Sequence, residues 1–103
     1  MRAKLEAQLA RFPQRADLRL ALAQACAREK DWPAVAEHAR AALELKPDYS
    51  AAYLWAGRAA VEAQALEQAN QYFQEGFVQA QAQGDKQIER QIQVFLKRLE
   101  RSE

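Results

Sequence analysis

The chain has 103 residues, enough for one domain with a continuous core and too few for a second lobe. Fifteen basic residues against fourteen acidic ones give a net charge of +1, whereas a duplex-binding domain carries a concentrated basic face, so nucleic acid is not an expected partner. No stretch approaches the roughly 20 apolar residues that span a bilayer, and the first residues lack the apolar core of a signal peptide. We therefore expect a cytoplasmic protein with no membrane partner.

Apolar residues recur at steps of three and four along the whole chain, and no segment shows the two-residue alternation of a strand. In chain order, this pattern predicts helices over residues 3–12, 16–28, 32–45, 50–62, 66–83 and 85–101. Asp31 is placed to cap the third helix, and Pro33 lies in its first turn, where a missing N–H costs nothing. Pro47 prevents that helix from continuing.

The last predicted helix carries its apolar residues on one stripe and its basic residues largely off it. The stripe consists of Ile88, Ile92, Phe95, Leu96 and Leu99. The basic residues are Lys86, Arg90, Lys97 and Arg101. This pattern is typical of a helix that closes one end of a helical array.

The chain repeats itself at an offset of 34 residues. Pro13 and Pro47 are separated by that distance, and so are the members of the series Leu9, Leu43, Phe77 and the series Leu5, Ala39, Phe73. A period of this length indicates stacked helical hairpins.

Two glycines fall at repeat positions where the preceding unit has alanine: Gly57 aligns with Ala23, and Gly76 would be matched by Ala42. Glycine in a helix interior costs about 1 kcal/mol relative to alanine, so something must offset that cost. We expect helix backbones to approach closely at both glycines, and substitution Gly57→Leu to overpack the contact by about 1 to 3 kcal/mol.

Together these residues resemble the tetratricopeptide repeat family, whose pattern is a bulky residue, Leu-Gly and an aromatic in the first helix, then Ala-x3-Phe and a closing Pro in the second. The second unit carries Tyr53, Ala56-Gly57, Ala69 and Phe73, and residues 31–47 are the most family-like stretch. Arg19, Gln81 and the turn at residues 63–66 depart from the pattern. The whole chain, including its last helix, looks like small stand-alone bacterial members of this family.

The resemblance implies an all-α fold, a right-handed solenoid of antiparallel helix pairs with a C-terminal capping helix. We expect a single domain over residues 1–103. It divides into a half-repeat helix at 1–13, repeat one at 14–47, repeat two at 48–84 and the capping helix at 85–103.

In such solenoids the first helix of each pair lines the concave, partner-binding side. By resemblance, the positions that face this groove are Leu20, Gln24 and Ala27 in the first unit and Leu54, Arg58 and Val61 in the second. The family's chaperone-tail binders have Lys and Asn there to clamp a terminal carboxylate, and here only Arg58 could take a carboxylate. We expect a protein-interaction module that binds a peptide or helical segment offering apolar anchors and a carboxylate.

An alternative stays open: the groove could be occupied by the last helix or by a second copy, in a homo-oligomer or in a subunit of a larger helical assembly. The expected state is a monomer or a weak homodimer.

Residues able to carry out chemistry are few, so we expect neither an enzyme nor a bound cofactor or metal. Cys26 is the only cysteine and is predicted to be buried, while His38 is predicted to be a solvated surface residue. Trp32 is expected to be a core wedge between the units. For Trp55 the pattern leaves two possibilities, a place near the surface or packing against a neighbouring helix.

Overall fold

The computed structural model describes residues 1–102, which form six α-helices and no strand. The helices are α1 (Arg2–Arg11), α2 (Ala16–Arg28), α3 (Trp32–Leu45), α4 (Ser50–Glu62), α5 (Leu66–Gln83) and α6 (Lys86–Ser102). The middle four have the predicted bounds, and α1 and α6 are each displaced by one residue. The predicted all-α helical repeat fold is therefore confirmed, while residue 103 of the predicted capping segment lies outside the described residues.

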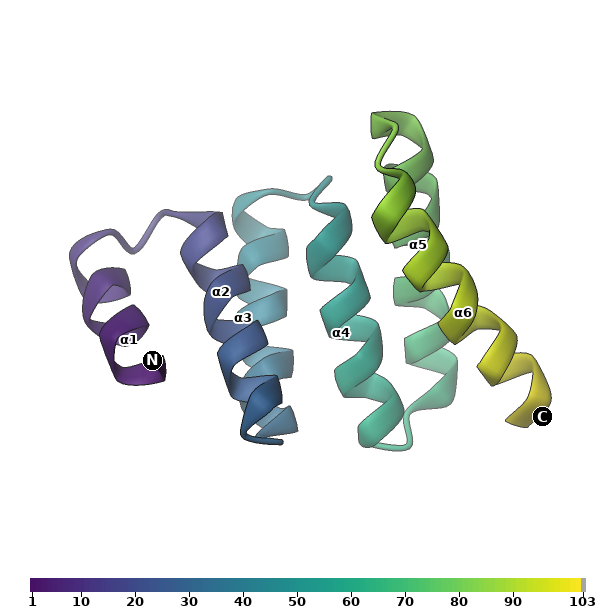
Figure 1. The fold of residues 1–103 in the computed structure, drawn as a ribbon, viewed down its shortest axis with the longest axis horizontal. Coiled ribbons are helices and arrows are strands. Elements are labelled where there is room, and N and C mark those ends of the chain that lie inside the picture. The colour runs from purple at the N-terminus through teal and green to yellow at the C-terminus, as the bar shows by residue number, and fades with distance from the viewer. Residues whose placement is uncertain (103) are drawn as a thin grey trace.

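The helices form an elongated array measuring 41 × 28 × 19 Å. Each helix packs against the next one along the chain, and α4 also contacts both α2 and α6. Figure 1 shows α2, α4 and α6 in the nearer layer, with α3 and α5 behind them. We call the surface built by the nearer three helices the α2–α4–α6 face. Among the described helices none is long and apolar enough to cross a membrane.

Two interhelical turns have the same backbone geometry 34 residues apart. Lys30, in the turn between α2 and α3, has φ 60°, and Gln64, in the turn between α4 and α5, has φ 63°, both in the left-handed region. The amide of Asp31 donates to the Cys26 carbonyl at 2.9 Å, and that of Ala65 donates to the Ala60 carbonyl at 2.9 Å. The sequence period thus appears as a repeated turn in the backbone.

Two aspartates begin helices by accepting backbone hydrogen bonds. Asp31 accepts from the amide of Ala34 at 3.3 Å, as the sequence predicted. Asp85 accepts from the amide of Ile88 at 3.2 Å, and its other carboxylate oxygen accepts from the Ser50 hydroxyl at 3.3 Å. One side chain therefore caps α6 and ties it to the first residue of α4.

The buried side chains form two clusters that share α4. The first cluster joins α4, α5 and α6 and consists of Leu54, Ala60, Ala69, Phe73, Ile92 and Leu99. The second joins α2, α3 and α4 and consists of Ala23, Cys26, Val35 and Ala59. All five residues of the apolar stripe predicted for α6 belong to the first cluster or pack against it.

The close approach at the glycines differs from the expectation of backbone against backbone. A Cβ atom added to Gly57 would lie 2.6 Å from Phe73 Cδ1 and 2.7 Å from Cζ of the same ring. At Gly76 it would lie 2.6 Å from Tyr53 Cβ and 2.8 Å from Ile92 Cδ1. Each glycine therefore leaves room for side chains of a neighbouring helix, which offsets its cost in helix stability.

Candidate functional site

Three of the six predicted groove residues line one pocket between α2 and α4. The pocket has a volume of about 500 Å³. Its lining residues are Gln24, Ala27, Arg28, Lys30, Trp32, Trp55 and Arg58. We call it the tryptophan pocket, because both tryptophans of the chain line it.

The other three predicted residues lie elsewhere. Leu54 is only 3% exposed and belongs to the α4–α5–α6 cluster, so the expectation that it lines an open groove needs correction. Val61 packs against the same cluster, and Leu20 is half-buried on α2 outside the pocket. The physical reason is that α6 packs on α4 and covers this part of its surface. The repeat pattern within α4 does not reveal which side chains a neighbouring helix covers.

Arg58 is surrounded by aromatic rings from three helices. Its Cζ lies 4.5 Å from the ring centroid of Trp55, 5.2 Å from that of Phe95 and 5.7 Å from that of Trp32. Partial burial lowers the pKa of Arg58 below its ordinary value, with a smaller lowering effect from Arg98 and an opposing effect from Glu62. A guanidinium stays protonated in proteins, so these rings hold a cation in place.

The two tryptophans and two basic residues complete the pocket beyond the predicted set. Trp32 and Trp55 are both half-buried and pack against the α2–α3–α4 cluster. Trp32 thus packs between the units, but it is not the core wedge that was expected, because its ring also lines the pocket. Trp55 combines both possibilities left open for it. Arg28 and Lys30 are exposed at the end of α2 and in the turn after it. The groove positions implied by the family resemblance end at Ala27 in this unit, so neither residue was among them.

Three basic residues and no acidic residue line the pocket. Glu29 and Asp31, the acidic residues next to Lys30, are both paired with Arg2 at 3.0 Å. Within residues 1–102, Arg28, Lys30 and Arg58 take part in no salt bridge. The pocket therefore presents cationic groups whose charge no carboxylate of the described chain neutralises by direct contact.

Cys26 and His38, the side chains considered as candidates for chemistry, have structural roles. Cys26 is fully buried, as predicted, and burial raises the pKa of its thiol. His38 was predicted to be solvated, and this is wrong: it is 9% exposed, and its Nδ1 lies 3.0 Å from Arg19 Nη1. Among the described residues, no group of His, Cys, Asp and Glu side chains has an arrangement that could hold a metal ion.

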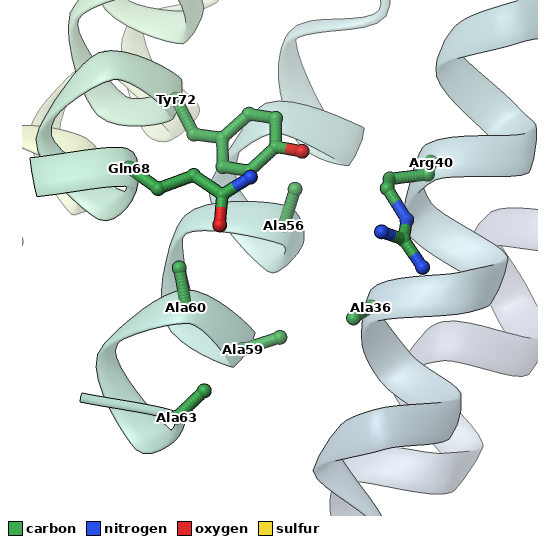
Figure 2. A pocket seen from close by; sticks show the side chains of 8 residues that line it. All are labelled: Ala36, Arg40, Ala56, Ala59, Ala60, Ala63, Gln68 and Tyr72. Carbon is green, nitrogen blue, oxygen red and sulfur yellow. The ribbon is translucent and has the colours of Figure 1, made fainter. Parts of the chain in front are cut away.

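A second hollow lies on a different face of α4, between α3 and α5 (Figure 2). Its volume is about 80 Å³, and alanines at positions 36, 56, 59, 60 and 63 line most of it. Figure 2 shows Arg40 on one side and Gln68 and Tyr72 on the other. The hollow is much smaller than the tryptophan pocket, so the tryptophan pocket is the better candidate site.

Comparison with known proteins supplies relatives that span nearly the whole chain. No model of a known protein family matches the sequence. Over 98 residues, however, the chain is 36% identical to the TPR repeat-containing protein PA0015 of Pseudomonas aeruginosa, an alignment that covers 95% of this chain and 93% of that protein. The solution structure of protein BPP2914 from Bordetella parapertussis is similar with a TM-score of 0.80 and 36% identity, covering 99% of this chain and 89% of that one.

Proposed function

Because this chain belongs to the tetratricopeptide repeat family, we propose that it is a non-catalytic protein-interaction module that binds a peptide or a helical segment of a partner protein in the concave groove of the array. The proposed groove is the α2–α4–α6 face, and the proposed binding site in it is the tryptophan pocket between α2 and α4. One observation supports the proposal: Gln24, Ala27 and Arg58, which the family resemblance predicts to face the groove, line the same pocket as both tryptophans. Binding pockets in proteins commonly combine aromatic walls with a few polar groups in this way.

The energetics favour a weak complex. Fully burying one large apolar side chain contributes about 1.5 to 3 kcal/mol, whereas association costs an estimated 4 to 15 kcal/mol. With Leu54 already in the core, the apolar contribution has to come from Ala27 and the accessible parts of the two tryptophans. A charge-assisted hydrogen bond from Arg58 adds to it. We expect a dissociation constant of roughly micromolar order.

A substitution that places a bulky side chain in the tryptophan pocket tests whether the partner binds there. Affinity purification from native extract would identify a partner, and the purified partner would then be titrated against the wild type and two variants. Ala27→Phe narrows the tryptophan pocket, and we expect it to weaken binding about tenfold or more. Ala82→Phe adds the same ring at an exposed position of α5 and serves as the matched control.

Equal affinity for the wild type and both variants would mean that the partner binds elsewhere, and the proposal would be wrong. Circular dichroism of Ala27→Phe checks that the variant is folded before its affinity is compared.

The alternative of a self-assembled helical array remains testable in parallel. The chain's own α6 covers Leu54 and Val61, while the tryptophan pocket opens between α2 and α4. Light scattering distinguishes the two cases, since a monomer at high protein concentration leaves the pocket free for a partner. A stable dimer that Ala27→Phe dissociates would instead indicate that a second copy fills the groove.

A further inference from the structure

The tryptophan pocket contains a cation, Arg58, for which the described residues supply no side-chain acceptor. The rings of Trp32, Trp55 and Phe95 surround the guanidinium of Arg58. Aromatic rings attract a cation and fix its position, yet they accept no conventional hydrogen bond. Throughout residues 1–102, the structure contains no side-chain hydrogen bond or salt bridge to Arg58.

The basic residues near Arg58 favour the binding of an anionic group in the pocket. Arg28 and Lys30 line the same pocket from α2 and from the turn after it. The two acids that flank Lys30 are paired with Arg2 at 3.0 Å each, which offsets part of their negative charge. Glu62 acts on Arg58 through space but forms no salt bridge within the described chain. A ligand carboxylate would therefore meet three positive groups that form no salt bridge within the described chain.

We propose that the tryptophan pocket selects an acidic segment of the partner protein, with one side-chain carboxylate on Arg58, an adjacent apolar side chain against Trp32 and Trp55, and further acidic residues toward Arg28 and Lys30. This inference rests on the proposed function and adds the chemistry of the segment that binds. A guanidinium held in a fixed orientation suits the two oxygens of a carboxylate, because its N–H groups form a planar fork. Since Arg28 and Lys30 add further positive groups to the pocket besides Arg58, the recognised acids are side chains within the segment, and a free C-terminus is not required.

The two tryptophans provide a direct test, because the chain has no others and their emission reports on this pocket. The probes are short peptides that are acetylated, amidated and free of tryptophan. They share the same Leu and Phe positions and differ only in carrying Glu, Gln or Lys at the remaining sites. A short thymidine oligonucleotide is the fourth probe, since bases can also stack on tryptophan and phosphates can bind arginine.

We expect the Glu peptide to bind at least about tenfold more tightly than the Gln peptide at low salt, and its advantage to shrink as salt rises. The Lys peptide should bind more weakly than the Gln peptide. Arg58→Gln should remove most of the Glu peptide's advantage over the Gln peptide. The double variant Arg28→Gln, Lys30→Gln should reduce this advantage, and both of its positions are exposed, so its folding should be unaffected. Arg40→Gln, an exposed arginine of α3 outside this pocket, should change neither affinity.

Several outcomes overturn the inference. Equal affinities for the Glu and Gln peptides, or no binding by any peptide, would show that acidity is not what the pocket recognises. Tighter binding of the oligonucleotide would reassign the pocket to nucleic acid. If the identified partner still loses affinity with Ala27→Phe while the charge variants have no effect, the proposed function stands and the acidic selectivity fails.

Discussion

Phe73 occupies the space that a side chain at Gly57 would need. Its ring is fully buried and stacks on Phe95, with centroids 5.4 Å apart and an interplanar angle of 15°. The ring therefore has little freedom to move away from α4. Gly57 is thus tied to the tertiary packing of three helices, although it lies in the middle of a helix where alanine would be intrinsically more stable.

Gly57→Ala should destabilise the protein by about 1 to 3 kcal/mol, even though the change favours the helix by about 1 kcal/mol. The added Cβ would lie 2.6 Å from Phe73 Cδ1, well inside van der Waals contact. Chemical denaturation followed by circular dichroism measures the change. Introducing Phe73→Leu into the Gly57→Ala variant should make the two effects less than additive, because the smaller side chain relieves the contact. A higher melting temperature for Gly57→Ala would contradict the packing described here.

The environment of His38 depends on a neighbouring helix. The sequence suggested an outward position on α3, but Arg19 of α2 approaches it to 3.0 Å. Burial lowers the pKa of the imidazole, and Arg19 and Arg2 lower it further, while Glu37 and Glu6 oppose this. The neutral ring can accept a hydrogen bond from the guanidinium, and a protonated ring cannot.

The stability should consequently fall as pH decreases through about 6.5, the ordinary pKa of histidine. Below that value the unfolded chain takes up a proton that the native state resists, so the free energy of unfolding decreases until the folded-state pKa is reached. Urea midpoints between about pH 7.5 and 5.5 should shift more for the wild type than for His38→Gln. Parallel pH dependences for the two proteins would remove His38 as the cause.

At the scale of elements, α6 has two roles. Its apolar stripe completes the core over α4 and α5, which the sequence predicted for a closing helix. It also places the Phe95 ring 5.2 Å from the guanidinium carbon of Arg58, which lines the candidate site. Leu99 is buried, so a charge at this position would test the core and would not report on an interface between copies.

Ile92→Ala should lower the free energy of unfolding by about 2 to 5 kcal/mol, because Ile92 is fully buried between α4 and α5. Val94→Ala, on the same helix and 47% exposed, should change it by no more than about 0.5 kcal/mol. Denaturant titrations of the two variants make the comparison. Similar losses in both would show that α6 does not pack on the core through the face described.

The whole molecule is held together by α4, which supplies Leu54 and Ala60 to one buried cluster and Ala59 to the other. If α4 moves away from one cluster, its residues in the other cluster move too, and apolar surface in both clusters becomes exposed. Both tryptophans pack against the α2–α3–α4 cluster, whereas helicity reports on all six helices.

Unfolding followed by tryptophan emission and by circular dichroism should therefore give coincident transitions, as two-state behaviour requires. Ile92→Ala, which lies in the other cluster, should shift both transitions equally. A tryptophan transition left in place while helicity is lost earlier would show that the two clusters unfold independently.

The sequence by itself determined the helices and the class of fold. Signals for starting and ending a helix are local: Asp31 accepts a hydrogen bond from the first turn of α3, and Gly84 adopts φ 70° after α5. The repeat offset and the apolar stripe of α6 add information about which faces are buried. The signals that start and end a helix depend on residues a few positions apart, which explains why the predicted bounds agree with the structure to within one residue.

Only the tertiary structure decided which surface remains accessible. Whether Leu54 lines a groove or lies in the core depends on where α6 crosses α4, and the fate of His38 depends on which side chain of α2 faces it. The tryptophan pocket likewise joins residues of α2, α3, α4 and the turn at Lys30, brought together by the angle at which the hairpins stack. Such contacts follow from the packing of whole helices, which a periodic pattern within one helix does not specify.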